Sequence, residues 1–357
     1  MNFRKPSLSF RENFLRAVGF RYPEYIPCFI DILPATWNAY REQLADVALR
    51  HPLIFRDFKL ENLACRNEAG LLKSKRTFKD PFGCVWIFLI DGLEGQVVKH
   101  PLEDWEYFKD FKLPDPEWGL PSMSGELIPW DKVFEGLEEA KRKGDLVVGS
   151  MPHSFFFQRL YYLRGFTNLM KDFVKKPQQL YSLIEQLTEY NLELVKKLLE
   201  FNDLDIISFG DDLGMQDRLP MSPRVYRELI IPAYRKIFKY VRDKGIHVYL
   251  HTDGHILEIV NDLIESGVSI LNVESQTNGV ENLTNYRGRV CLDVYVDPQY
   301  LLPFGTPSEV KAYVKRMVRF LSLKTGGLIV RAELDPPIKL ENIEALCQVM
   351  EEIMWLH

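Results

Sequence analysis

Long apolar runs are missing from this sequence of 357 residues, although 46% of its residues are hydrophobic. No stretch of about 20 apolar residues is present that could span a bilayer. The segment from Met1 to Glu12 is polar and charged and lacks the apolar core of a signal peptide. We therefore expect no membrane association and a cytoplasmic location.

An excess of charge of one sign is missing too. The 45 basic and 50 acidic residues are interleaved, with a net charge of −5, so no basic stripe is available for nucleic-acid phosphates. The five cysteines are scattered, which argues against a disulfide framework and against a thiolate metal cage. We expect a small-molecule substrate, and reduced, mostly buried thiols at Cys28, Cys65, Cys84, Cys291 and Cys347.

Motifs for covalent or nucleotide chemistry are also missing. No serine, cysteine or lysine lies in a known nucleophile motif. Gly326-Gly327 has neither a third glycine nor a phosphate-loop lysine, and it is predicted to form a tight turn.

What is present is an alternation, from Gly144 onward, of short β-branched runs with longer segments of helical period. This pattern is typical of a parallel sheet with crossover helices. A (β/α)8 TIM-type barrel needs about 250 residues, and seven candidate strands suit a closed barrel better than an open sheet. The candidates are Ile26–Ile30, Leu146–Ser150, Asp205–Phe209, His247–Leu250, Ile270–Val273, Val290–Val294 and Leu328–Ala332.

The segment 34–143 interrupts this alternation. It is rich in aromatic residues and holds a hairpin-like stretch, Thr77–Val98, with turns at Asp80-Pro81 and Asp91-Gly92. We expect a single domain, 1–357, in which 34–143 is an insertion-rich N-terminal part that roofs the mouth of the barrel.

Helix-capping residues and a leucine-rich face support the predicted alternation of strands and helices. The segment Gln178–Leu199 carries leucines along one face. Ser222-Pro223 and Thr306-Pro307 each place an N-cap hydroxyl before a proline, and Glu309 completes a capping box with Thr306.

Polar residues follow the predicted strands at their carboxyl ends, which in such a barrel face the mouth. Imidazole and carboxylate groups gathered there can hold a divalent metal, or a carboxylate can stabilise positive charge and exchange protons with a substrate. For the aspartates, capping of the next helix is an equally simple interpretation. The candidate catalytic residues are Asp211, Asp212 and His251, and the candidate substrate-binding residues are His153, Glu274, Asp297 and Phe156, whose aromatic neighbours could instead be core.

Several of these stretches resemble the uroporphyrinogen decarboxylase superfamily. The similarity covers most of the chain and implies a barrel with its active site in the mouth. The stretches that carry it are Arg11–Ala17 followed by Tyr25-Ile26-Pro27, Met221-Ser222-Pro223 through Pro232, His251-Thr252-Asp253-Gly254, Gly305-Thr306-Pro307 through Gly327, and Leu340–Leu346.

The decarboxylases of this superfamily grip the substrate carboxylates with an arginine-rich segment near the amino terminus. The corresponding stretch here, Phe29–Tyr40, has no arginine. Decarboxylases also end the last strand with a histidine in a glycine-rich turn, where this chain has Arg331–Asp335. A polycarboxylate without arginine partners would be poorly held, which argues against a porphyrinogen substrate.

The other branch of the superfamily comprises methyltransferases that work with a corrinoid protein, and its thiol-methylating members bind zinc through a His-x-Cys pair and a later cysteine. This chain keeps His251 but has Asp253 at the cysteine position and no cysteine near Glu333. The resemblance thus implies an oxygen-rich zinc site of His251, Asp253 and Glu333, with Asp212 as a further candidate. Zinc in such a site is a Lewis acid suited to an ether or alcohol oxygen.

The resulting hypothesis is a corrinoid-dependent, zinc-assisted methyltransferase that moves a methyl group from a small methoxylated compound, aromatic compounds included, to a corrinoid protein. One alternative is a carboxy-lyase acting on a porphyrinogen, with Asp211 or Asp212 stabilising a protonated ring. A second alternative is a non-catalytic barrel that binds a ligand. The sequence makes no prediction of oligomeric state.

Overall fold

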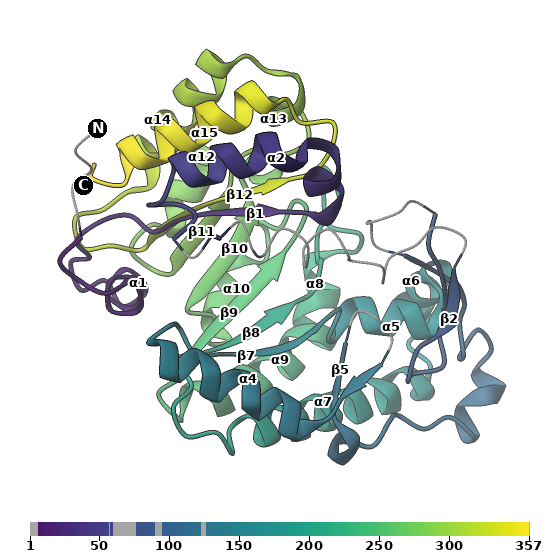
Figure 1. Cartoon of the computed structure of the whole chain (residues 1–357). Helices are drawn as coiled ribbons and strands as arrows, with labels where there is room; N and C mark the ends of the chain where they lie inside the picture. Colours follow the sequence, from purple (N-terminus) through teal and green to yellow (C-terminus); the bar gives the residue numbers. More distant parts are fainter. Residues whose placement is uncertain (1–5, 57, 60–75, 90–94, 123–125, 357) are drawn as a thin grey trace. The chain divides into compact units, whose positions relative to one another are not determined.

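The structure is a computed structural model that describes residues 6–56, 58–59, 76–89, 95–122 and 126–356 (Figure 1). Its residues form two compact units. Unit 1 comprises Met1–Leu71, Asp91–Leu93 and Asn272–His357, and unit 2 comprises Leu72–Ile90 and Glu94–Leu271. All seven predicted strands are present, and helices alternate with them along the chain, which confirms the α/β class. The single domain 1–357 stays a prediction.

Unit 1 is built on parallel strands. β1 (Cys28–Ile32) and β11 (Cys291–Tyr295) both pair with β12 (Leu328–Leu334), with Cys28 opposite Val330 and Leu292 opposite Leu328. β1 starts two residues later than predicted, because the Ile26 amide donates to the Met354 carbonyl, outside the sheet. Figure 1 shows the long helices of this unit, α2 (Pro34–Arg50), α14 (Pro307–Leu321) and α15 (Leu340–Ile353), running beside β1 and β12.

Helix α14 illustrates how the sequence defines an element of unit 1. The Thr306 hydroxyl accepts from the Glu309 amide and the Glu309 carboxylate accepts from the Thr306 amide, which confirms the predicted capping box. The buried residues of the helix repeat at helical spacing, so its apolar stripe faces the core. They are Val310, Val314, Met317, Val318 and Leu321.

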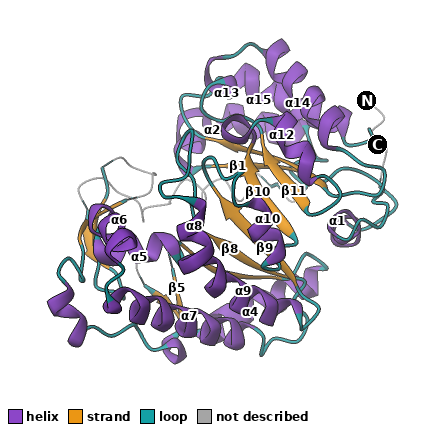
Figure 2. Cartoon of the chain, turned by 180° about the vertical axis from the view of Figure 1, so that it is seen from behind, coloured by secondary structure: helices purple, strands orange, loops and turns teal. Residues whose placement is uncertain are grey.

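Unit 2 holds the other parallel strands, β7 (Val148–His153), β8 (Ile206–Gly210) and β9 (His247–Thr252). The helices α7 (Gln178–Leu198) and α9 (Ile231–Arg242) pack against these strands (Figure 2). The predicted leucine stripe of α7 is confirmed as a buried face. β10 (Ile270–Glu274) begins in unit 2 and ends in unit 1.

The segment 34–143 is shared between the units. Its helix α2 belongs to unit 1, whereas the antiparallel hairpin strands β2 (Thr77–Lys79), β3 (Val85–Ile87) and β4 (Gln96–Lys99) belong to unit 2. The predicted turn at Asp91-Gly92 lies outside the described residues. Unit 2 also contains η2 (Trp105–Lys109), η3 (Pro116–Trp118), β5 (Leu120–Pro121), β6 (Leu127–Ile128) and α4 (Trp130–Lys143).

The remaining elements are short. Ser222 lies at the N-cap of α8 as predicted, but its hydroxyl makes no capping hydrogen bond in the described structure, and the helix continues into a π-helical turn, η4. The four described cysteines are buried and free, whereas Cys65 lies outside the described residues. In the described part of the chain no helix is long and apolar enough to cross a membrane.

The remaining short elements of the two units are α1 (Phe10–Val18), α5 (Phe157–Arg164), α6 (Phe166–Lys175), α8 (Pro223–Val225), η4 (Tyr226–Ile230), α10 (Val260–Glu265), α11 (Ser275–Asn278), α12 (Val280–Leu283), η5 (Thr284–Tyr286) and α13 (Leu301–Phe304).

A buried histidine ties two helices of unit 1 together. His51, the C-cap residue of α2, hydrogen-bonds through Nδ1 to Glu351 at 2.9 Å and through Nε2 to Glu344 at 3.2 Å, both on α15. Burial lowers the pKa of His51, but the hydrogen bonds and charges of Glu351 and Glu344 outweigh it, so the pKa is raised. The protonated imidazole is therefore the form that stabilises the fold.

We expect His51→Gln to lower the free energy of unfolding by about 1–3 kcal/mol at pH 6, where the imidazole is charged. A raised folded pKa means that this stabilisation is present below about pH 6.5 and is lost as the pH rises through the folded value. Urea unfolding of both proteins at pH 6 and pH 9 measures the difference. A difference in unfolding free energy between the two proteins that increases toward pH 9 would contradict a stabilising role of the protonated His51.

Candidate active site

Three neighbouring strands of unit 2 carry imidazole and carboxylate groups at their carboxyl ends. β7 ends on His153, and His251 is the last residue but one of β9. In the sheet register His153 lies opposite Gly210, the last residue of β8, and Gly210 lies opposite His251. Asp212 follows Gly210 by two residues. The parallel pairing therefore brings together residues that are far apart in the sequence.

Glycines create the room for this arrangement. A Cβ on Gly210 would lie 2.5 Å from Cδ2 of His153, so the imidazole ring occupies the space where a side chain would stand. Gly254 has a φ of +81°, and a Cβ there would lie 2.4 Å from the carbonyl carbon of Gly214. The loops after β8 and β9 thus touch backbone to backbone, which holds Asp212 and Asp253 beside each other.

The side chains meet at distances that suit a metal ion. Nε2 of His153 lies 3.6 Å and Nε2 of His251 lies 3.7 Å from Oδ1 of Asp212. One ligand atom of each of the three residues lies within 4.8 Å of the others. Ligand atoms about 2.1 Å from a tetrahedral zinc ion lie about 3.4 Å from one another, so small side-chain movements would complete such a site.

Asp253 is placed as a further ligand or proton acceptor. Its Oδ1 lies 3.6 Å from Nε2 of His251, and its side chain is half exposed. We call His153, Asp212 and His251 the triad, and Asp253 stands at its solvent side. Two imidazoles and one or two carboxylates form a donor set for Zn²⁺ and comparable divalent ions, with positions left for water or substrate.

Hydrogen bonds from neighbouring residues orient the triad. Nε2 of Gln158 donates to Oδ2 of Asp212 at 2.8 Å, while the Asp212 amide donates to Oε1 of the same glutamine at 3.0 Å. The other ring nitrogen of His153, Nδ1, lies 3.2 Å from the Ser154 hydroxyl. Partners of this kind fix the orientation of metal ligands and raise their affinity.

The charge state of Asp212 also suits a ligand. Burial raises its pKa, but the hydrogen bond and charge of His153 lower it. The charge of His251 and the Asp253 amide, 3.2 Å from Oδ1, act in the same direction, and the net pKa lies below the usual range. Asp212 is therefore a carboxylate at neutral pH.

Asp211, the neighbouring candidate, has a different role. It is fully buried, and its carboxylate accepts from the amides of Phe157 and Gln158, at the amino end of α5, and from the Tyr234 hydroxyl at 2.6 Å. Burial raises the pKa of Asp211 to about 6 against these hydrogen bonds. Asp211 thus caps α5, which precedes it in the chain, and not the next helix as the sequence suggested, whereas Asp212 faces the histidines.

The other predicted residues lie elsewhere. Phe156 is fully buried and packs against Phe155 and Tyr234 in the core of unit 2. Glu274, Asp297 and Glu333 belong to unit 1, so the structure does not place them relative to the triad. Within unit 1, Asp297 accepts from the amides of Gln299 and Tyr300 in a turn, Glu274 accepts from Gln276 and Thr277, and Glu333 lies opposite Asp31 on β1.

Unit 1 contains a compact ion cluster near Glu333. Arg331 donates to Asp293 at 2.9 Å and to Asp31 at 2.6 Å, and its guanidinium carbon lies 4.6 Å from the centre of the Phe29 ring. Asp293 is fully buried. Both carboxylates engage the guanidinium group, Asp293 from a buried position and Asp31 from a half-exposed one.

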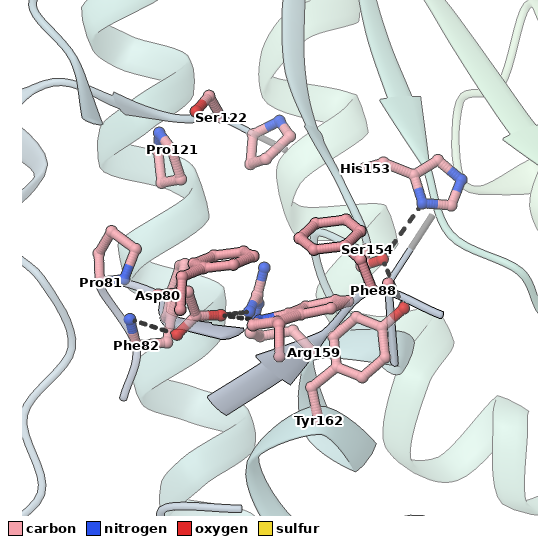
Figure 3. Close-up of a pocket in the computed structure, with 14 residues that line it drawn as sticks. Asp80, Pro81, Phe82, Phe88, Pro121, Ser122, His153, Ser154, Arg159 and Tyr162 are labelled. Carbon is pink, nitrogen blue, oxygen red and sulfur yellow. Dashed lines mark hydrogen bonds and ion pairs between the residues drawn. The ribbon is translucent and has the colours of Figure 1, made fainter. Parts of the chain in front are cut away.

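A pocket adjoins the triad in unit 2, and His153 forms part of its wall (Figure 3). Its volume is about 40 Å³. Sequence reasoning missed this pocket, although the aromatic content of the hairpin-like stretch was a signal for it. The residues from that hairpin are Phe78, Asp80, Phe82, Trp86 and Phe88, and α5 adds Arg159 and Tyr162.

Comparison with solved structures bears on the fold. A methyltransferase from Methanosarcina mazei matches over 97% of this chain and 99% of its own, with a TM-score of 0.65 and 19% identity. A xylose isomerase-like TIM barrel protein from Mycobacterium smegmatis, in complex with magnesium, matches 67% of this chain and 97% of its own at 10% identity, but its TM-score of 0.29 supports no argument. The first likeness shows that the chain has the same fold as that protein.

Comparison by sequence identifies the family. No curated protein matches the chain. A family model described as uroporphyrinogen decarboxylase (URO-D) matches residues 156–353, more than half of the chain. The matched region contains Asp212, His251 and Asp253, while His153 lies just before it. The chain belongs to the uroporphyrinogen decarboxylase (URO-D) family.

Proposed function

We propose that the protein is a methyltransferase that moves a methyl group from a small methoxylated compound to the cobalt of a separate corrinoid protein, with zinc held by the triad. The observation that carries this proposal is the convergence of His153, Asp212 and His251 at the carboxyl ends of β7, β8 and β9. This donor set adds His153 to the residues predicted from the sequence, and the structure does not place Glu333 relative to the triad.

Each residue of the site has a role in this proposal. His153, Asp212 and His251 hold the ion, and Gln158 and Ser154 orient Asp212 and His153. Zinc bound there would act as a Lewis acid on the ether oxygen of the substrate. Asp253, half exposed beside His251, is placed to exchange a proton with the departing alcohol or phenol oxygen.

The donor set favours an oxygen substrate. Zinc sites that activate thiols are rich in sulfur, and the described cysteines are buried with no thiol in the triad. A site of imidazole and carboxylate leaves the ion harder and more electrophilic, which suits an ether oxygen.

The fold supports the same assignment at a coarser level. We propose that the strands form part of a (β/α)8 barrel with the triad in its mouth, and that the segment 34–143 covers this mouth. The likeness to the methyltransferase from Methanosarcina mazei supports that proposal. The burial and three donors of Asp211 leave it no face for a substrate, so the porphyrinogen decarboxylase alternative rests on Asp212.

A methyl-transfer assay with free cobalamin tests the proposal. The zinc-loaded protein is mixed with chemically reduced cobalamin and, in turn, with methoxylated aromatic and aliphatic compounds, and methylcobalamin is followed by its absorption spectrum. We expect protein-dependent methylcobalamin with at least one methoxylated compound. Failure with all of them, together with release of carbon dioxide from uroporphyrinogen, would establish the decarboxylase instead.

A further inference from the structure

The pocket beside His153 contains a buried arginine among aromatic rings. The residue Arg159 is 7% exposed, and its guanidinium carbon lies 3.9 Å from the centre of the Phe82 ring and 5.6 Å from that of Tyr162. Figure 3 shows Arg159 beside Asp80, among the side chains that line the pocket. The proposed function gives this cation no role.

Among the described residues Arg159 has two hydrogen-bond partners, the Asp80 carboxylate and the Cys84 thiol, which together need fewer donors than its guanidinium group has. Nη1 donates to Oδ2 of Asp80 at 3.1 Å, and a guanidinium group has five N–H donors. Buried polar groups in proteins are usually hydrogen-bonded. Arg159 also lines the pocket, so a ligand in the pocket is a natural source of further acceptors.

The Asp80 carboxylate accepts hydrogen bonds from three donors besides Arg159. Its Oδ1 accepts from the amides of Phe82 at 3.0 Å and Cys84 at 2.9 Å, and its Oδ2 accepts from Nε1 of Trp86 at 2.9 Å. The hairpin turn and Trp86 therefore hold Asp80 in place independently of Arg159. Asp80 in turn holds the edge of the guanidinium group that carries Nη1.

The size of the pocket limits what can enter it. A cavity of about 150 Å³ holds a benzene ring, whereas one water molecule takes about 30 Å³ of liquid volume. The pocket, at about 40 Å³, is much smaller than a cavity that holds a ring, and it suits a group of a few atoms. A carboxylate is planar, anionic and of this size, and it matches two parallel N–H donors of arginine.

The pocket is connected to the triad. His153 lines the pocket and also belongs to the triad. The Ser154 hydroxyl contacts Nδ1 of His153 and lies 3.4 Å from the Tyr162 hydroxyl, on the pocket wall. Ser154 has a φ of +62°, a left-handed conformation that non-glycine residues rarely adopt and that occurs at functional sites.

We propose that Arg159 binds the carboxylate of the substrate, so that the methyl donor is a small methoxylated carboxylic acid whose acid group enters this pocket. Naming the ligand as the substrate rests on the proposed function. The binding of a carboxylate by Arg159 rests on the pocket alone.

Calorimetric titration of the zinc-free protein with methoxyacetate and with its neutral counterpart methoxyacetamide tests this proposal. Removing zinc first excludes binding of the acid to the metal. We expect the acid to bind at least ~10-fold more tightly than the amide, because a charged hydrogen bond is worth more than a neutral one. Equal binding, or no binding of the acid, would overturn the proposal.

Two variants locate the binding. Arg159→Lys keeps the charge beside Asp80 but loses the planar fork, and it should weaken methoxyacetate at least ~10-fold. The pair Asp80→Asn with Arg159→Met removes both charges together, so no buried carboxylate is left unpaired, and it should abolish the preference for the acid. Unchanged affinity in a folded double variant would overturn the proposal, whereas acid binding without any methyl transfer would contradict the proposed function alone.

Discussion

The His251→Ala protein is expected to lose methyl transfer by about 10³-fold or more. The substitution removes one of three ligands, and the Lewis-acid contribution of a bound metal is worth several kcal/mol of transition-state stabilisation. At about 1.4 kcal/mol for each factor of ten, that contribution corresponds to roughly three orders of magnitude. The measurement is the initial rate of methylcobalamin formation at saturating zinc and substrate.

A control for this variant lies on the same strand. His247 begins β9, at the end opposite His251, and His247→Ala should leave the rate within about twofold. Two carboxylate variants make the same comparison. Asp212→Asn should lose methyl transfer as His251→Ala does, and Asp217→Asn is its control, because Asp217 is exposed and pairs with Arg218. A His251→Ala protein as active as His247→Ala would remove the triad from the mechanism.

The Gly210→Ala protein should bind zinc about 10–100-fold more weakly, the range found when the support of a metal ligand is removed. An added methyl group would stand 2.5 Å from the His153 ring and force it out of line with Asp212. The crowding should also lower the free energy of unfolding by about 1–3 kcal/mol. Competition with a chromophoric zinc chelator measures the affinity, and urea unfolding measures the stability.

Gly136 provides the matched control for this change. It lies in α4, and a Cβ added there would meet no atom within 4 Å among the described residues. Gly136→Ala should leave zinc affinity unchanged and raise the free energy of unfolding by up to about 1 kcal/mol, because alanine favours the helix. Equal zinc affinities in the Gly210 and Gly136 variants would show that His153 is not held by this contact.

The strands could be predicted from the sequence because buried parallel strands combine apolar, β-branched runs with helical segments between them. The end of β7 was harder to predict from the sequence. Its predicted limit was Ser150, but the strand continues past an irregularity in pairing to His153, with Pro152 inside it. An irregularity of this kind depends on the neighbouring strand, so local sequence does not reveal it.

The sequence named the residues of the candidate site but did not predict which of them lie together. His251, Asp212 and His153 were all predicted from strand ends, but His153 was predicted to bind substrate, whereas the structure groups it with Asp212 and His251. The register that sets His153 and His251 on either side of Gly210 is a property of the paired sheet. Asp211 and Asp212 are adjacent in the sequence, and only burial and hydrogen bonding distinguish their roles.

Arg159 was beyond the reach of sequence reasoning. It lies within α5, where an arginine normally reaches solvent, and its burial depends on the hairpin residues Asp80 and Phe82 about 80 positions earlier. Contacts of such sequence separation arise only once the fold is formed.

Zinc binding by the chelator-treated protein is the most direct test of the triad. The wild-type protein, His251→Ala and His153→Ala are each titrated with zinc, and bound metal is measured by elemental analysis after removal of free ions. We predict about one equivalent of zinc in the wild type and its loss in both variants, with His247→Ala behaving as the wild type. A wild-type protein that takes up no zinc, or a His153→Ala protein that binds zinc as tightly as the wild type, would contradict the site described above.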